Sequence, residues 1–221
     1  MSLPPFLDPA MFGIEFAYTL IVVLLCFLVY YKTKEFYDLT RYKGIGYFRN
    51  AFLFFGLAYA SRFLLHILTF TTRFFFDVFA PRSIVFPLSM VLVGYFSTMA
   101  IFYLTYSVIW KKIRYKHFIA FSNITAMIIS LVAFISRSNV LLSLLQLLLL
   151  VFTVTISFVK HEKAKKKTNI RALYLLIAAF WLINLFLIGP RRAPFEFKFV
   201  LQAISLIVFL LIYYKVSKWI K

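Results

Sequence analysis

Acidic residues and cysteine are scarce in this sequence. Asp and Glu together make up seven of its 221 residues, and Cys26 is the single cysteine. One cysteine excludes an intrachain disulfide and any metal site that needs several thiolates. The motifs HExxH and GxSxG and paired acidic motifs are missing as well. We therefore expect no catalytic residue, no metal and no cofactor, and we expect Cys26 to pack in an apolar core.

Apolar and aromatic residues dominate the chain instead. Hydrophobic residues make up 63% of it and charged residues 14%, a composition far from that of a soluble domain. A helix needs roughly 20 mainly apolar residues to cross the hydrocarbon core of a bilayer. We expect an all-α polytopic transmembrane bundle, a single membrane domain over residues 1–221. Its expected helices are seven: approximately 12–31, 47–70, 84–110, 118–136, 140–159, 170–189 and 197–216.

Basic residues are concentrated in alternate connections between the expected helices. Of the 25 Lys and Arg residues, 18 lie within 32–49, 111–116, 160–171 and 215–221, and six lie on the opposite side. The positive-inside rule therefore places the N-terminus outside and the C-terminus in the cytoplasm. This topology and attraction to anionic lipid headgroups, ~1 kcal/mol per basic residue near the surface, explain the positive charge. Membrane lipids are an expected partner, and nucleic acid is not.

Helices 1 to 3 and 5 to 7 have a weak internal similarity. At one offset Arg49 aligns with Arg171, Tyr59 with Trp181, and Arg62 with Asn184. Such a repeat would be parallel, with helix 4 as the linker, and a chance similarity is the alternative. This three-one-three plan with an external N-terminus resembles the sugar-efflux, PQ-loop and KDEL-receptor group of seven-helix membrane proteins. The Pro-Gln dipeptide that names the PQ-loop proteins is absent, so the resemblance assigns no residues.

A second resemblance rests on residues 32–63, which read KTKEFYDLTRYKGIGYFRNAFLFFGLAYASRF. This stretch is similar to a pattern in uncharacterised archaeal membrane proteins. The resemblance implies a prokaryotic plasma membrane and implies no activity. Within the stretch, we expect the first helix to continue for one or two turns beyond residue 31 and the chain to break at Gly44 and Gly46.

Arg62 is the basic residue that topology does not explain, because it lies deep within an expected span and not at one of its ends. On a helix it shares a sector of about 80° with Tyr59 and His66. A guanidinium facing lipid costs from ~2.5 kcal/mol upward, so Arg62 is expected to point inward. Glu15 is the acidic residue within a span, and burying it alone is also unfavourable. We expect Glu15 and Arg62 to form an ion pair, with His66 near the same junction.

Three interpretations of this constellation stay open. The pair is a staple between helices 1 and 2, or Arg62 reaches the outer headgroups, or the residues line a pocket that opens outward. Such a pocket would be cationic and aromatic and would suit an anionic or amphipathic ligand. Its candidate ligand-binding residues are Arg62, His66, Glu15, Tyr59, Asn184, Gln202 and Gln146, with Ser89 as a further polar group in the same outer half.

Mixed charges surround the first cytoplasmic connection. They are Glu35, Asp38, Arg41, Lys43 and Arg49. These residues either form a docking surface for a cytoplasmic output protein or make solvated juxtamembrane salt bridges.

The expected function is that of a non-enzymatic receptor or sensor in the membrane. Transporters often break helices at Gly or Pro near the midplane, and few such residues occur in these spans. A receptor needs only an outer pocket, continuous helices and a charged cytoplasmic face. A small-solute or lipid transporter is the first alternative, and a structural membrane subunit, in which Glu15 and Arg62 only staple two helices, is the second.

Overall fold

The described residues form seven helices, one at each expected span. The computed structural model describes residues 9–76, 82–111, 117–136, 138–161, 168–188 and 195–220, and contains no strand within them. The helices are α1 (Pro9–Thr40), α2 (Lys43–Phe76), α3 (Arg82–Ile109), α4 (Phe118–Ser136), α5 (Asn139–His161), α6 (Thr168–Ile188) and α7 (Phe195–Ile220). In α1, α3, α4, α5 and α7 the described part is long and apolar enough to cross a membrane, and α6 has a shorter apolar stretch, Arg171–Leu187. The protein is thus a multi-pass helical membrane protein.

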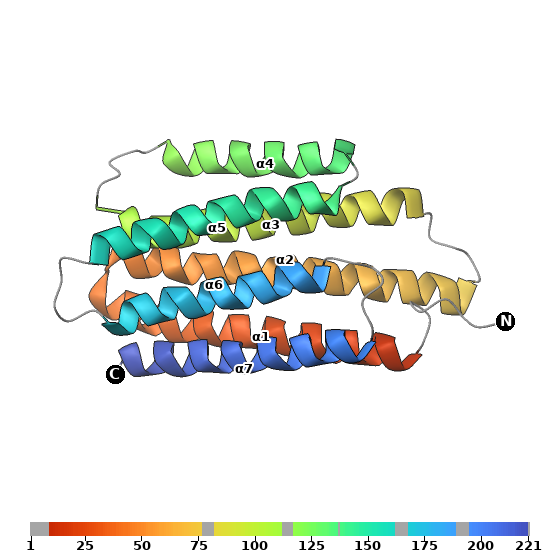
Figure 1. The fold of residues 1–221 in the computed structure, drawn as a ribbon, viewed down its shortest axis with the longest axis horizontal. Coiled ribbons are helices and arrows are strands. Elements are labelled where there is room, and N and C mark those ends of the chain that lie inside the picture. Colours follow the sequence, from red (N-terminus) through yellow and green to blue (C-terminus); the bar gives the residue numbers. More distant parts are fainter. Residues whose placement is uncertain are drawn as a thin grey trace.

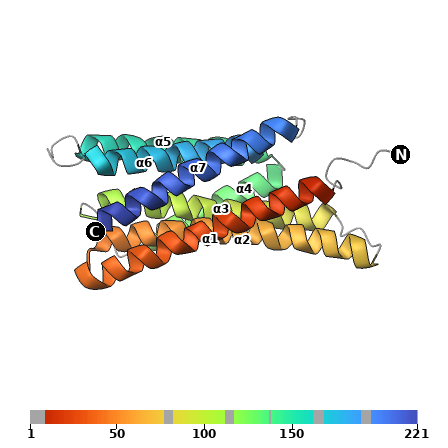
Figure 2. The ribbon, with the colours of Figure 1, turned by 90° about the horizontal axis from the view of Figure 1, so that it is seen from below.

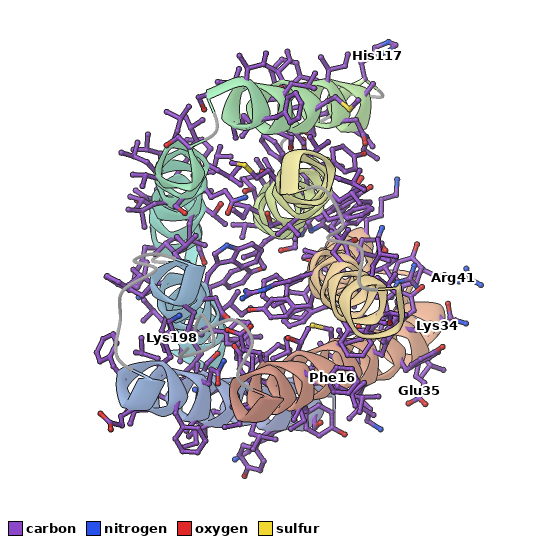
Figure 3. All side chains as sticks on the ribbon, turned by 90° about the vertical axis from the view of Figure 1, so that its right-hand side faces the viewer. Phe16, Lys34, Glu35, Arg41, His117 and Lys198 are labelled. Atoms are coloured by element: carbon purple, nitrogen blue, oxygen red, sulfur yellow. The ribbon has the colours of Figure 1, made fainter. Side chains whose placement is uncertain are left out.

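Six of the helices form a ring, and α4 lies outside it. Around the ring, contacts join α1 to α2, α2 to α3, α3 to α5, α5 to α6, α6 to α7, and α7 back to α1 (Figure 3). α4 packs against α3 and α5. Consecutive helices run in opposite directions (Figure 1), so omission of α4 from the ring makes α3 and α5 parallel neighbours. α1 and α7 are the second parallel pair and lie side by side (Figures 1 and 2).

This ring has the arrangement that the three-one-three plan predicts. The unit α1–α2–α3 and the unit α5–α6–α7 each have their middle helix between the other two. The two units meet twice, at α3 with α5 and at α7 with α1. A two-fold operation along the helices would exchange these two interfaces, as a parallel repeat requires.

The bundle has two chemically different ends. We call the end at which α1 begins the N-terminal end. The opposite end, where α1 and α7 finish, is the basic end, because the helix termini and connections there include Lys32, Lys34, Arg41, Lys43, Lys111 and Lys218. The start of α1 and the end of α7 lie at opposite ends of the molecule (Figure 1).

The first connection is shorter than expected, and the predicted break at Gly44 and Gly46 is wrong. α1 continues to Thr40 and α2 begins at Lys43, so both glycines lie inside α2. The chain turns at Arg41, which has a positive φ of 52°. The glycines are needed for packing instead. A Cβ at Gly44 would lie 2.7 Å from Nε1 of Trp110, and a Cβ at Gly46 would lie 2.9 Å from Cε2 of Tyr37.

Aromatic side chains fill the centre of the ring between α2 and the pair α6 and α7. The ring of Phe55 lies 4.6 Å from that of Trp181, and Phe180 and Phe209 pack edge to face at 4.7 Å. Such pairs contribute about 0.5–1.5 kcal/mol each beyond the burial of their area. Cys26 is buried, as expected, and a Cβ on Gly56 would lie 3.1 Å from its Cβ.

Candidate functional site

A buried polar junction connects four helices in the half of the bundle near the N-terminal end. The hydroxyl of Tyr18 on α1 donates to Oδ1 of Asn184 on α6 at 2.7 Å and shares a hydrogen bond with Oγ of Ser205 on α7 at 2.9 Å. The hydroxyl of Tyr59 on α2 also donates to Oδ1 of Asn184. We call Tyr18, Tyr59, Asn184 and Ser205 the polar junction. It joins the beginning of the chain to its end.

Every hydrogen-bonding position of the Asn184 amide is occupied. Its Oδ1 accepts from the two phenols, and its Nδ2 donates to the carbonyl of Phe180 at 2.7 Å and to Oγ of Ser205 at 3.2 Å. An amide has two acceptor and two donor positions, so no capacity is left over. Buried and fully paired, the junction fixes the distances between α1, α2, α6 and α7.

Arg62 borders the junction from one turn further along α2. Its guanidinium lies close enough to the phenols of Tyr18 and Tyr59 to act on them electrostatically. The side chain is half-buried, which agrees with the expected inward orientation. Arg62 therefore adds a positive charge beside four otherwise neutral polar groups.

The expected ion pair between Glu15 and Arg62 is not formed. Phe16 and Phe63 stack beside them with ring centroids 4.6 Å apart, so Glu15 and Arg62 lie at similar heights. Their charged groups are nevertheless not within ion-pair distance, and the ion pair among the described residues is Lys32–Glu35 at 3.6 Å. Glu15 is half-buried within two turns of the start of α1. The helix staple in this protein is the polar junction.

The structure brings together only part of the expected pocket. Tyr59 and Asn184 meet in the polar junction, as described above. Gln146 lies elsewhere, on α5, where its Nε2 donates to Oγ of Ser97 at 2.6 Å. Gln202 is half-buried on α7, one turn before Ser205. The side chains of His66 and Ser89 lie outside the described part of the structure.

Two members of the junction, Tyr18 and Ser205, are absent from the expected set. Both had a signal in the sequence. Tyr18 follows Glu15 by three residues and Ser205 follows Gln202 by three, and such pairs share one face of a helix. Tyr18 resembles an ordinary aromatic core residue, and a serine inside an apolar helix usually bonds to its own backbone. Only the packing of the helices shows that both residues bond to Asn184 on α6.

The charged rim at the basic end is mostly exposed. Glu35, Asp38, Arg41 and Lys43 are open to solvent, and Figure 3 shows Glu35 and Arg41 projecting from the outside of the bundle. Arg49 differs, because it is half-buried beneath the aromatic rings of α1. It is therefore not part of the exposed surface formed by the other four.

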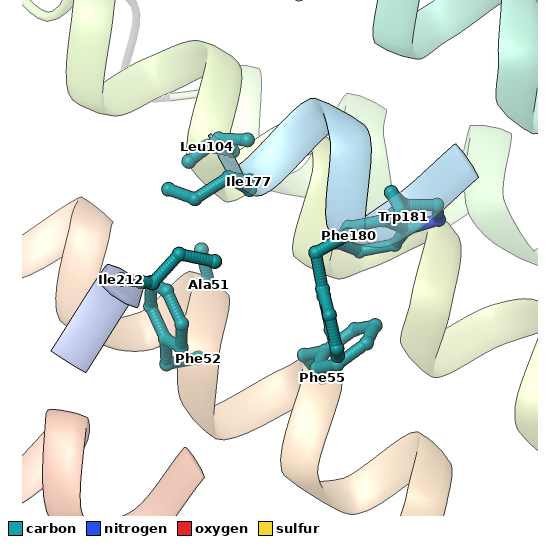
Figure 4. A pocket seen from close by; sticks show the side chains of 8 residues that line it. All are labelled: Ala51, Phe52, Phe55, Leu104, Ile177, Phe180, Trp181 and Ile212. Atoms are coloured by element: carbon teal, nitrogen blue, oxygen red, sulfur yellow. The ribbon is translucent and has the colours of Figure 1, made fainter. Parts of the chain in front are cut away.

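A small cavity lies near the centre of the ring (Figure 4). Apolar and aromatic side chains line it: Ala51, Phe52, Phe55, Leu104, Ile177, Phe180, Trp181 and Ile212. This lining offers no charge to an anion, so the cavity is not the cationic pocket expected from the sequence. The cavity lies between the unit α1–α2–α3 and the unit α5–α6–α7, beside the aromatic contacts between them.

Comparison with known proteins gives one full-length relative. A protein from Archaeoglobus fulgidus, described only as uncharacterised, is 34% identical over 224 residues, which cover 98% of this chain and 97% of the relative. No family model and no solved structure matches the chain. The similarity to this archaeal protein thus extends over almost the whole chain. The resemblance to the sugar-efflux, PQ-loop and KDEL-receptor group stays a prediction from the helix plan.

Proposed function

We propose, for a chain that belongs to the same family as the Archaeoglobus fulgidus protein, a non-enzymatic role as a membrane receptor or sensor. In this proposal the N-terminal end faces the outside of a prokaryotic plasma membrane and the basic end faces the cytoplasm. An anionic or amphipathic ligand reaches Arg62 from the outer side. A cytoplasmic output protein binds the exposed rim of Glu35, Asp38, Arg41 and Lys43.

The position of Arg62 beside the polar junction is the observation that carries this proposal. A carboxylate or phosphate drawn to Arg62 would be a stronger acceptor for the hydroxyls of Tyr18 and Tyr59 than the neutral Oδ1 of Asn184. Transfer of either phenol to the ligand would release α1 or α2 from α6. The ligand would thereby favour one packing of the two halves over another.

Two observations support alternatives. The polar junction and the apolar cavity both lie between the three-helix units, where rocking of the units in a small-solute or lipid transporter would occur. The complete pairing of Asn184 suits a structural subunit, in which the junction only holds the helices together. Each alternative predicts a different response to ligand.

The test is ligand-dependent thermal stability of the purified protein. Oleate and dodecyl phosphate serve as anionic amphipathic probes, and dodecylphosphocholine serves as the zwitterionic comparison. We expect an anionic probe to raise the melting temperature of the wild type more than that of Arg62→Gln, because binding to the folded state stabilises it. Lys198→Gln is the matched control, since it removes one positive charge from the same end of the bundle and should respond like the wild type.

The outcomes separate the three roles. An equal response of wild type and Arg62→Gln to every probe contradicts a ligand site at Arg62 and favours the structural subunit. Saturable uptake of the stabilising probe into proteoliposomes, lost in Arg62→Gln, would identify a transporter. Stabilisation without uptake supports the receptor.

A further inference from the structure

Buried polar atoms without a partner occur at one end of the molecule. Among the described residues they are Nε of Arg49, Oγ of Ser157, Nε of Arg171 and Oγ of Ser217. Each residue lies within six positions of a helix terminus at the basic end. Buried polar groups in folded proteins nearly always have a hydrogen-bond partner, so these atoms indicate a partner from outside the chain. For a hydroxyl a water molecule suffices, but a guanidinium calls for an anion.

Arg49 has the better defined surroundings of the two arginines. Its Cζ lies 4.9 Å from the ring centroid of Tyr37 and 5.3 Å from that of Tyr30, both on α1. The rings hold the guanidinium by cation–π contacts, which supply no hydrogen-bond acceptor. The ring of Tyr37 packs directly on the backbone of α2, in the space that a Cβ on Gly46 would take. This contact holds the ring in place. Arg49 is thus held in place by two rings and has no ion-pair partner among the described residues.

Among the described residues, the acidic side chains on the neighbouring part of α1 do not provide a counterion for Arg49. The carboxylate of Glu35 pairs with Lys32 at 3.6 Å, and Asp38 forms no ion pair with Arg49. Lys34 lies between Tyr30 and Tyr37 on the same face of α1, since it is four residues after one and three before the other. Lys34 and Arg41 are exposed and add positive charge beside the site.

The site also lies at the level expected for lipid headgroups. Arg49 is six residues, or about 9 Å, from the start of α2. Tyr30 and Tyr31 pack edge to face at 5.6 Å, and the ring of Tyr31 is 60% exposed. Tyrosines in this position mark the boundary between hydrocarbon and headgroups. An anion at this depth is most readily supplied by the bilayer.

We propose that Arg49, held between Tyr30 and Tyr37, binds the phosphate group of an anionic membrane lipid, with Lys34 and Arg41 as flanking charges. The planar guanidinium suits two phosphate oxygens at once, and binding at this edge supplies the missing counterion. Binding ties the headgroup to both α1 and α2. The site is independent of the function proposed for Arg62, which lies more than three turns further along α2.

The experiment measures lipid binding to wild type and variants in nanodiscs. Phosphatidylglycerol is titrated into a phosphatidylcholine background, and inorganic phosphate is added to pure phosphatidylcholine discs in a parallel arm. We expect Arg49→Gln to weaken phosphatidylglycerol binding by about tenfold or more, the loss typical of charge-assisted hydrogen bonds. Arg49→Lys keeps the charge but not the fork of donors, so its affinity should be intermediate. Lys43→Gln is the matched control and should bind like the wild type.

Each result decides the proposal. Equal weakening in Arg49→Gln and Lys43→Gln would reveal diffuse surface charge and overturn the site, and so would no weakening in either. Saturable stabilisation of wild type, but not of Arg49→Gln, by inorganic phosphate would support a phosphate site filled from solution. Saturation by phosphatidylglycerol alone would support the lipid as its source. Should Arg49→Gln fail to fold, the difference between Arg49→Lys and Lys43→Gln carries the test.

Discussion

The two ends of the bundle differ in the pairing of their buried polar groups. Some pair internally at the basic end, such as Ser107 with Tyr174, but the unpartnered buried atoms of the described residues also occur there. Near the N-terminal end, Tyr18, Tyr59, Asn184 and Ser205 satisfy one another across four helices. At the basic end, Arg49 and Arg171 keep a buried Nε without a partner among the described residues. The contrast separates two tasks. Polar groups that pair internally fix how the helices pack, and those without an internal partner indicate what the protein binds.

The repeat sharpens this contrast. Arg49 and Arg171 align in the internal similarity, and both have the same unpartnered atom near the start of the middle helix of their unit. At the other end the repeat is broken, because Arg62 aligns with Asn184, so a charge in one unit corresponds to a neutral amide in the other. The two three-helix units therefore differ at this position, where Arg62 borders the junction.

The largest effect is expected for Asn184→Ala. The substitution leaves the hydroxyls of Tyr18 and Tyr59 without their acceptor and opens a void, and should lower the free energy of unfolding by about 2–3 kcal/mol. Thermal unfolding in detergent measures it. Gln202→Ala is the control, since that amide has no hydrogen bond within the described residues, and it should cost much less. Equal losses would mean that the junction is not the main link between the chain halves.

A smaller loss is expected for Gly46→Ala at the basic end. The new Cβ would lie 2.9 Å from the Tyr37 ring, and displacing that ring should cost about 1–2 kcal/mol and loosen the stack on Arg49. Differential scanning calorimetry and the titration with phosphatidylglycerol check both effects.

Gly13→Ala is the matched control for this prediction. No atom lies within 4 Å of the Cβ position at Gly13, so the substitution should be neutral or stabilise the helix by up to about 1 kcal/mol. A destabilised Gly13→Ala, or a harmless Gly46→Ala, would contradict the packing described for the two glycines.

Tyr18→Phe should have an effect of about 1 kcal/mol, the size typical for one hydrogen bond between membrane helices. It removes a donor to Asn184 and a partner of Ser205 but keeps the ring. Tyr31→Phe, on the exposed face of the same helix, is the comparison and should leave the melting temperature unchanged. If both variants melt alike, the Tyr18 hydroxyl contributes nothing to packing.

The smallest effect concerns Glu15 and Arg62. Because no ion pair joins them, the effects of Glu15→Gln and Arg62→Gln on unfolding should add to within about 0.5 kcal/mol in the double variant. A double-variant cycle in thermal unfolding measures the coupling. A coupling well above that value would restore the staple expected from the sequence.

The sequence alone predicts the helices well, since length and hydropathy set each span. It also predicts the inward orientation of Arg62, because lipid exposure of a guanidinium is costly. It fails where partners come from distant segments. Tyr18 and Ser205 are 187 positions apart, and no local pattern indicates their contact. Scarcity of acidic residues predicts the ion pair of Glu15 with Arg62, but it says nothing about the polar junction that Arg62 borders.

The glycines near the first connection are a second case in which contacts with distant residues are not visible in the local sequence. Gly44 and Gly46 predict a break between helices, yet both lie inside α2. Glycine occurs there because the side chains of Trp110 and Tyr37 occupy the space that a Cβ would fill. Close approach between helices and a turn produce the same residue type. Only the packing distinguishes them.

The response of three proteins to phosphatidylglycerol tests the contrast between the two ends most directly. The increase in melting temperature on adding this lipid to phosphatidylcholine nanodiscs is measured for wild type, Asn184→Ala and Arg49→Gln. We predict that Asn184→Ala melts lowest but keeps the wild-type increase, and that Arg49→Gln loses most of the increase. Loss of the lipid response in Asn184→Ala together with its retention in Arg49→Gln would contradict the separation of the two tasks.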